Sequence, residues 1–315
     1  MRMLMLVVLI VTLILTAIAQ VKGPSDYSAP PNAPFTAEEI TVQVKSYTLA
    51  GTLLLPKSRT RRLPAVITIT GSGQQTRDEP LPLPGLEKYK PMRQIAELLA
   101  ERGIAVLRVD DRGIGSSTGR ETLMAATTSD FADDVRAEVA YLRSRSEIDG
   151  NRIALVGHSE GGTIAPMLAA SDPRIAAIVL MAGAGKSGDL ISMEQLRAVL
   201  DQDTSMTDEQ KKQKLAEEQE VIQAVQTGGD LSKYPAQVRL PWIREFWTYD
   251  PLPTIRKVRQ PILILQGALD RQVSAEQATM LEEAARSAGN KDVTKRMFPN
   301  LNHLFLPAKT GAFSE

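Results

Sequence analysis

The sequence of 315 residues contains no cysteine and only two histidines, His158 and His303. The absence of cysteine excludes disulfide bonds, thiolate metal sites and a cysteine nucleophile. Two histidines are also too few for a histidine-rich metal centre, so we expect no metal site. The chemistry of this chain must therefore use hydroxyl, carboxylate, amide and imidazole groups.

An excess of charge of either sign is also lacking, because 37 Lys and Arg residues balance 37 Asp and Glu residues. Long blocks of one sign do not occur, which argues against nucleic acid or an anionic membrane as a partner. The hydrophobic content of 43% is enough for a sizeable core. We expect one large domain with an insertion, and no pattern in the sequence fixes the oligomeric state.

The N-terminus has the features of an export signal. Arg2 precedes an almost wholly apolar run at 3–18, and Ala-Ile-Ala at 17–19 fits the small-x-small cleavage pattern. We predict a signal peptide over 1–19, a linker over 20–36, and a periplasmic or secreted protein. The alternative is a retained membrane anchor, because about 20 apolar residues can span a bilayer.

The remaining residues, 37–315, are predicted to form an α/β domain. Segments 39–44 and 47–55 alternate apolar and polar residues around a short turn, which indicates an antiparallel hairpin. Short apolar runs, mostly β-branched and typical of strands buried on both faces, follow at 65–69, 104–109, 153–156, 175–181 and 262–265, with a last strand expected at 293–298.

Segments with helical periodicity lie between these strands, at 92–102, 131–145, 162–170 and 275–288. Such a β-α alternation implies parallel strands with right-handed crossovers. The predicted fold is thus a mostly parallel, doubly wound α/β sheet with an antiparallel N-terminal hairpin.

The alternation is interrupted at about 186–251, where helical segments at 190–200 and 207–226 precede an aromatic cluster. We interpret this insertion as a helical cap over the carboxyl edge of the sheet, where open α/β sheets bind ligands. Trp242, Phe246 and Trp247 are the candidate wall of a substrate pocket. The alternative is a surface subdomain whose tryptophans form its core.

The motif Gly157-His158-Ser159-Glu160-Gly161 follows the strand at 153–156 and leads directly into the helix at 162–170. This is the setting of a nucleophile elbow, and its sharp turn leaves almost no room for side chains two positions before and after the serine. Ser159 is therefore the predicted nucleophile.

A second match, Gly115-Ser116-Ser117-Thr118-Gly119, is separated from its strand and enters no clear helix, so Ser117 is interpreted as a loop residue. The glycines at 113, 115 and 119 do not have the G-x-G-x-x-G spacing. Two carboxylates also precede them where pyrophosphate would approach, and we therefore exclude a dinucleotide site.

The serine needs a base, and the chain offers two imidazoles. His158 is adjacent to Ser159 and should point to the other side of the turn, whereas His303 follows the last strand and can lie over the serine. Asp270 follows the strand at 262–265 and is predicted to orient His303. The order Ser159, Asp270, His303 is the order that this fold requires. A purely structural role for His303 is the alternative.

Acyl transfer also requires hydrogen-bond donors for the oxyanion. The backbone amide of Glu160 is one candidate, since it follows the nucleophile. The loop after the strand at 65–69 supplies the other, and we favour the amide of Ser72 over that of Gly73. The side chains of Glu160 and Ser72 are expected to have no part in this role.

Several motifs together resemble bacterial α/β-hydrolase carboxylesterases of the dienelactone-hydrolase-like branch, over about residues 39–303. They are Ile69-Thr70-Gly71-Ser72-Gly73, Arg77-Asp78-Glu79, Val109-Asp110-Asp111-Arg112-Gly113, the serine motif and Gly267-Ala268-Leu269-Asp270. The resemblance implies hydrolysis of short acyl esters of small molecules with no metal or organic cofactor. True dienelactone hydrolases use a cysteine nucleophile, and related oligopeptidases usually carry an aromatic residue where this chain has Glu160.

Two alternative functions remain open from the sequence. A peptidase or amidase would use the same triad, and a non-catalytic binding protein could retain the fold and the capped pocket. The acyl and alcohol preferences depend on the geometry of the cap, so the sequence does not identify the natural substrate.

Overall fold

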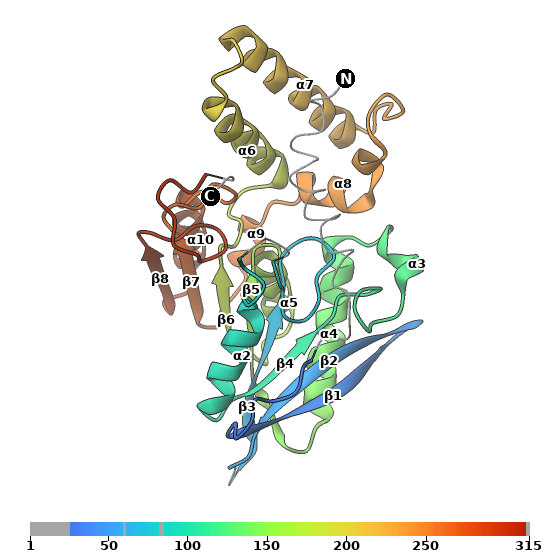
Figure 1. The fold of residues 1–315 in the computed structure, drawn as a ribbon, viewed down its shortest axis with the longest axis vertical. Helices are drawn as coiled ribbons and strands as arrows, with labels where there is room; N and C mark the ends of the chain where they lie inside the picture. The colour runs from blue at the N-terminus through green and yellow to red at the C-terminus, as the bar shows by residue number, and fades with distance from the viewer. Residues whose placement is uncertain (1–25, 59–60, 82–84, 313–315) are drawn as a thin grey trace.

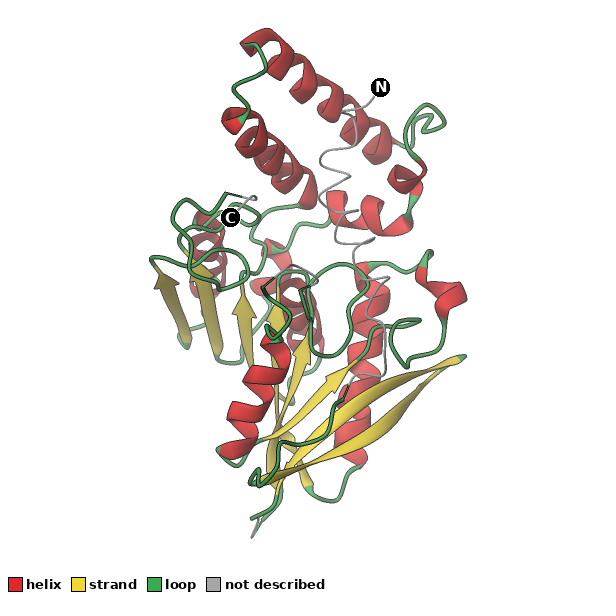
Figure 2. Ribbon diagram, viewed as in Figure 1, coloured by secondary structure: helices red, strands yellow, loops and turns green. Residues whose placement is uncertain are grey.

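The protein is described by a computed structural model over residues 26–58, 61–81 and 85–312, so the predicted signal peptide lies outside the described residues. An eight-stranded sheet forms the centre of the fold (Figures 1 and 2). The strands are β1 (Phe35–Val44), β2 (Tyr47–Pro56), β3 (Leu63–Ile69), β4 (Ala105–Val109), β5 (Ile148–His158), β6 (Ile175–Met181), β7 (Ile262–Gly267) and β8 (Val293–Phe298). The helices are α2 (Pro91–Glu101), α3 (Arg120–Leu123), α4 (Thr128–Ser144), α5 (Gly161–Ser171), α6 (Gly188–Gln202), α7 (Asp208–Thr227), η2 (Ala236–Arg239), α8 (Pro241–Thr248), α9 (Leu252–Ile255) and α10 (Glu276–Ser287).

The strands lie in the order β1-β2-β4-β3-β5-β6-β7-β8. β2 is antiparallel to both of its neighbours, β1 and β4, and the pairs from β4 through β3 to β8 are all parallel. The mostly parallel sheet and the antiparallel N-terminal hairpin predicted from the sequence are therefore confirmed.

Helices cover both faces of the sheet (Figure 2). One face packs against α4, α5, α9 and α10 around buried aliphatic residues such as Leu107 and Leu155. The other face packs against α2 and includes Val66 and Val106. Because the inner strands are buried on both sides, their sequences are continuous apolar runs rather than alternating ones.

The main differences from the predicted boundaries have local causes. Helix α4 begins at Thr128, three residues before the predicted start, because Thr127 and Asp130 form a reciprocal capping box at its N-terminus. Strand β5 begins at Ile148, which pairs with Leu63 before a register shift. Helix α8 was not predicted, although Pro241 occupies its first turn, where proline is favoured.

The segment between β6 and β7 forms a helical cap above the carboxyl ends of the strands (Figure 1). Helices α6, α7 and α8 pack on one another around a separate hydrophobic core that includes Val221, Ile222 and Trp247. Within residues 26–58, 61–81 and 85–312, no helix has the length and apolar character needed to cross a membrane.

Candidate active site

Ser159 lies on a sharp turn between β5 and α5. Its φ angle is +52°, a left-handed conformation that a residue with a side chain adopts only under strain. A Cβ atom on Gly157 would overlap the carbonyl oxygen of Gly161, and one on Gly161 would overlap that of Ile69. The turn also keeps its shape through the Ser159 amide, which donates to the Met181 carbonyl over 2.8 Å. The backbone thus holds this serine at the carboxyl edge of the sheet, next to the N-terminus of α5.

His303 and Asp270 are directly hydrogen-bonded. His303 Nδ1 lies 2.8 Å from Asp270 Oδ2, and both side chains are buried. Asp270 also accepts the side-chain amide of Gln266 on Oδ2 and the backbone amides of Gln272 and Val273 on Oδ1. These donors fix the carboxylate, which in turn fixes the imidazole with Nδ1 as donor and leaves Nε2 able to accept a proton.

A cavity of about 70 Å³ lies between the sheet edge and the cap. Ser159 and His303 both line it, as do Ser72 and Glu160, whose amides were predicted as oxyanion donors. The structure therefore brings together at one cavity the residues predicted from three separate loops. Asp270 lies behind His303, away from the lining.

The aromatic residues of the cap divide between two environments. Trp242 and Phe246 line the cavity, with their rings stacked at 4.9 Å between centroids. Trp247, predicted to share this wall, is instead 2% exposed in the core of the cap, where its Nε1 donates to Ser192 Oγ over 3.0 Å. The prediction for Trp247 is wrong because α8 places this side chain in the core of the cap.

The side chain of Glu160 has contacts that the sequence analysis did not anticipate. Its Oε1 accepts the hydroxyl of Thr128 over 2.5 Å and the indole N–H of Trp242 over 2.7 Å. Burial raises the pKa of Glu160, and the two hydrogen bonds oppose that rise. The cap is further held by Glu245, which accepts the backbone amide of Ser129 at the start of α4. The residue after the serine thus joins the elbow to the cap.

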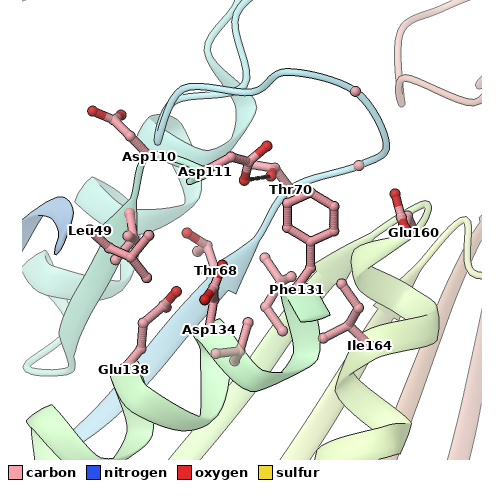
Figure 3. Close-up of a pocket in the computed structure, with 15 residues that line it drawn as sticks. Leu49, Thr68, Thr70, Asp110, Asp111, Phe131, Asp134, Glu138, Glu160 and Ile164 are labelled. Atoms are coloured by element: carbon pink, nitrogen blue, oxygen red, sulfur yellow. Dashed lines mark hydrogen bonds between the residues drawn. The ribbon is translucent and has the colours of Figure 1, made fainter. Parts of the chain in front are cut away.

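A smaller cavity of about 40 Å³ is also lined by Glu160. Its other lining residues include several carboxylates (Figure 3). Burial raises the pKa values of Asp111 and Glu138 well above their ordinary range. Thr68 Oγ1 is buried there without a hydrogen-bond partner among the described residues. A space of this size accommodates water. Among the residues that the structure describes, no group of three or more His, Asp or Glu is arranged to hold a metal ion.

Ser117, in the second serine motif, has a structural environment. Its hydroxyl donates to the Asp110 carbonyl over 2.8 Å and accepts the Ala50 amide over 2.9 Å. The residue is not among those that line the cavity of Ser159. Its hydrogen bonds connect β2 to the loop after β4, consistent with the interpretation of Ser117 as a loop residue.

The sequence profile of the family described as serine aminopeptidase, S33 (Hydrolase_4) matches residues 85–308 of this chain. The chain belongs to this family. The matched region contains Ser159, Asp270 and His303, so the S33 hydrolase family covers the whole candidate triad and the cap. Ser72 lies upstream of the match.

Several solved structures resemble that of this S33 family member, although their sequences have low identity to it. Est1E from Butyrivibrio proteoclasticus, solved with ferulic acid, is 19% identical with a TM-score of 0.58, covering 84% of this chain and 91% of that chain. The Pyrococcus furiosus esterase Pf2001 is 16% identical with a TM-score of 0.58, covering 89% and 88%. Acylaminoacyl peptidase from Pyrococcus horikoshii is 16% identical with a TM-score of 0.55, covering 86% and 38%. These similarities confirm the α/β-hydrolase fold.

A curated relative matches over a shorter region. The quorum-quenching protein AidA of Acinetobacter baumannii (strain MDR-ZJ06) is 37% identical over 97 residues, which are 30% of this chain and 32% of that protein. The chain thus matches about a third of the length of this relative.

The charged motifs of this S33 hydrolase form buried ion pairs. Arg77 pairs with Asp110 at 2.9 Å, and its neighbour Asp78 pairs with Arg108. Glu79, the third residue of the motif, lies 2.8 Å from His158 Nδ1. The sequence showed these residues only as part of a family resemblance. The available signal in the sequence was a run of charged residues a few positions after the glycine-rich loop that follows a buried strand.

Proposed function

We propose that this protein is a serine hydrolase of the carboxylesterase type that cleaves small-molecule esters. The observation that carries the proposal is the shared cavity, in which Ser159 on its strained turn faces the same space as His303, the partner of Asp270. Around this cavity the cap supplies aromatic surface from Trp242 and Phe246. Such a site suits an acyl or alcohol group of apolar character.

In the first half of the reaction, Ser159 Oγ attacks the ester carbonyl carbon while His303 Nε2 accepts the hydroxyl proton. Asp270 stabilises the imidazolium that forms. The negative charge on the carbonyl oxygen is stabilised by the amides of Glu160 and Ser72, aided by the positive end of the α5 dipole. Collapse of this intermediate transfers the proton from His303 to the alcohol, which leaves, and the acyl group remains on Ser159.

In the second half, a water molecule attacks the acyl-enzyme carbonyl as His303 accepts one of its protons. The same two amides stabilise the second oxyanion. When this intermediate breaks down, the carboxylic acid is released and the proton returns to Ser159 Oγ. All of these steps use groups of this chain and one water molecule.

Amide or peptide hydrolysis is the second candidate, and the description of the matching family as serine aminopeptidases favours it. The two candidates differ in the leaving group, which must be protonated more completely when it is an amine. Turnover of an ester and an amide with the same acyl group distinguishes them. A higher kcat/KM for the amide than for the ester would contradict the proposed ester specificity.

The first test is covalent labelling. We expect a fluorophosphonate to form a single adduct on Ser159, detected by intact mass and peptide mapping, with turnover of short p-nitrophenyl esters in parallel. Ser159→Ala should abolish both signals. Failure of the wild-type protein to form the adduct would instead favour a non-catalytic binding protein on this fold.

We also propose that the enzyme acts outside the cytoplasm, on the basis of the apolar segment and the Ala-Ile-Ala sequence near the N-terminus. The mass of the protein isolated from periplasmic and culture fractions tests this proposal. Cleavage after Ala19 is the expected result. Recovery of the full-length chain in the membrane fraction would identify the segment as an anchor.

A further inference from the structure

We infer that Glu79 and His158 act together as a positioning pair that holds the oxyanion loop and the His303 loop at a fixed separation. This inference rests on the proposed function, because it concerns how the proposed base and oxyanion donors are placed. Neither residue lines the substrate cavity. They act through hydrogen bonds to backbone groups: Glu79 accepts the amide of Gly71, and His158 donates to the carbonyl of His303.

The hydrogen bonds of His158 define its protonation. Nε2 lies 3.0 Å from the carbonyl oxygen of His303, which can only accept, so Nε2 must carry a proton. Nδ1 lies 2.8 Å from Glu79 Oε1, which already accepts the amide of Gly71 over 2.7 Å. A carboxylate in this position requires a donor from the imidazole as well. His158 is therefore an imidazolium, and the pair is a buried ion pair.

On the side of the oxyanion loop, the pair sets the position of Gly71. A Cβ atom built on Gly71 would lie 2.9 Å from Glu79 Oε1, 3.2 Å from Ser159 Cβ and 3.5 Å from His158 Nδ1. This backbone is therefore packed against the pair and the serine together. Because Ser72 follows Gly71 directly, fixing the Gly71 amide also limits where the proposed oxyanion donor can lie.

On the side of the base loop, the pair holds the backbone of His303 itself. The adjacent carbonyl of Leu304 accepts the hydroxyl of Tyr89, so two neighbouring carbonyls are held by side chains from elsewhere in the fold. Within the loop, Asn302 Oδ1 accepts the amides of Leu304 and Leu306. The imidazole of His303 is thus positioned both by its backbone, which is held by His158, and by its hydrogen bond to Asp270.

The segment that carries Glu79 is itself rigid. Glu79 has a φ angle of +52°, a strained conformation that the surrounding contacts must maintain. The preceding residues Arg77 and Asp78 are each buried and paired, with Asp110 and Arg108 respectively. A rigid support of this kind suits a residue whose function is to place two other loops.

Electrostatics keep His158 protonated over a wide pH range. Burial lowers the pKa of His158, but the charge and hydrogen bond of Glu79, the His303 carbonyl and the charge of Asp270 raise it to about 9. The other ionisable groups nearby are His303, whose ring centroid is 5.0 Å from that of His158, and Tyr89 beside Glu79. Both hydrogen bonds of His158 should therefore be intact below pH 9, and one of them should be lost above it because a neutral imidazole has a single N–H.

The experiment compares Glu79→Gln, His158→Gln and the double variant with the wild type, by kcat, KM and the rate of fluorophosphonate labelling. Each single variant should lower kcat and the labelling rate about 10- to 100-fold with little change in KM, the loss expected for one hydrogen bond to a charged group. Because the two residues act as a unit, the double variant should lose no more than the worse single variant. Losses that multiply in the double variant would overturn the inference.

Asp134→Asn is the matched control, since it removes a buried carboxylate of α4 whose partners are Arg112 and Tyr47 rather than the two loops. It should reduce thermal stability as Glu79→Gln does, but leave kcat within about twofold of the wild type. If both variants lower kcat equally, the role of Glu79 is structural only and the inference fails. If Glu79→Gln does not fold, the comparison of His158→Gln with Asp134→Asn decides the question.

The pH profile supplies an independent readout. Wild-type kcat should decline above about pH 9, and His158→Gln, which cannot titrate at this position, should lack that decline. The same decline in both proteins would count against the pair. Failure of the proposed function is distinguishable, because the wild type would then show neither turnover nor an adduct on Ser159.

Discussion

The indole nitrogen of Trp242 lies 2.7 Å from the carboxylate of Glu160, the residue that follows Ser159. One hydrogen bond between two residues that line the cavity therefore connects the cap to the elbow. Glu160 also carries one of the amides proposed to stabilise the oxyanion. The position of the cap and the geometry of the reaction site are consequently linked through a single residue.

Trp242→Phe tests this link, because it keeps an aromatic ring beside Phe246 and removes only the indole N–H. We expect kcat/KM for a p-nitrophenyl ester to fall about tenfold, as one hydrogen bond to the carboxyl group of Glu160 is lost. Trp247→Phe is the matched control, since its N–H contacts Ser192 inside the cap. It should cost about 1 kcal/mol of stability and leave kcat/KM unchanged. Equal effects of both changes on kcat/KM would contradict the link.

Asp270→Asn should reduce kcat on the order of 10⁴-fold, because an asparagine at this position favours the wrong tautomer of His303. Ser159→Ala should reduce kcat on the order of 10⁶-fold if the three residues act as a unit. Steady-state turnover of a short ester measures both. The exposed Asp208→Asn is a suitable control, and a loss of only a few-fold in Asp270→Asn would argue against its assignment.

Ser117→Ala tests the competing serine motif. Its hydroxyl has one buried and one partly buried hydrogen bond, so its removal should cost about 1–3 kcal/mol of unfolding free energy. Ester turnover at a temperature where the variant is folded should match the wild type. The adjacent Ser116→Ala, at an exposed position, should alter neither property. A specific loss of fluorophosphonate labelling in Ser117→Ala would instead assign the nucleophile to this motif.

Glu218 in the cap should make stability depend on pH. Burial raises its pKa from 4.5 to about 7, and Oε1 has no hydrogen-bond partner among the described residues. The folded state binds this proton more tightly than the unfolded state, so the contribution to stability is complete below pH 4.5 and is lost as the pH rises through 7.

The corresponding variant, Glu218→Gln, cannot ionise and should avoid this loss. Relative to its own stability at pH 4.5, it should gain about 3 kcal/mol over the wild type by pH 8. Urea unfolding at the two pH values measures the difference. Glu209→Gln, on an exposed side chain of the same helix, should show no such gain. A parallel pH dependence in Glu218→Gln and wild type would show that Glu218 is not the titrating group.

Much of the fold could be predicted because buried parallel strands have a distinctive composition. The apolar runs that form β3, β5 and β6 have the composition of strands that are buried on both faces of a sheet. Likewise, the glycines around Ser159 follow from the steric demands of one short turn. These properties are local, so a single sequence contains them.

The assignment of the cap aromatics failed for a geometric reason. Trp242 and Trp247 are five positions apart, which in a helix places their side chains about 140° from each other. They cannot form one wall, whereas Trp242 and Phe246, four positions apart, can. Recognising Pro241 as the first residue of a helix would have provided this distinction.

The contact between Glu79 and His158 could not be predicted, because it joins residues 79 positions apart through the packing of three loops. The position of His158 beside Ser159 predicts that its side chain points away from the serine, but not which residue it contacts there. Charged residues usually indicate solvent exposure, and only the three-dimensional structure shows which of them are buried with a partner.

The cap and the sheet have separate hydrophobic cores. A substitution inside the cap core can therefore change the shape of the cap side of the cavity without destabilising the strands that precede Ser159, Asp270 and His303. Mutation can alter which molecules enter while the reaction itself is preserved. An enzyme with this arrangement can change its substrate range gradually, through single substitutions in the cap that leave the stability of the sheet unchanged.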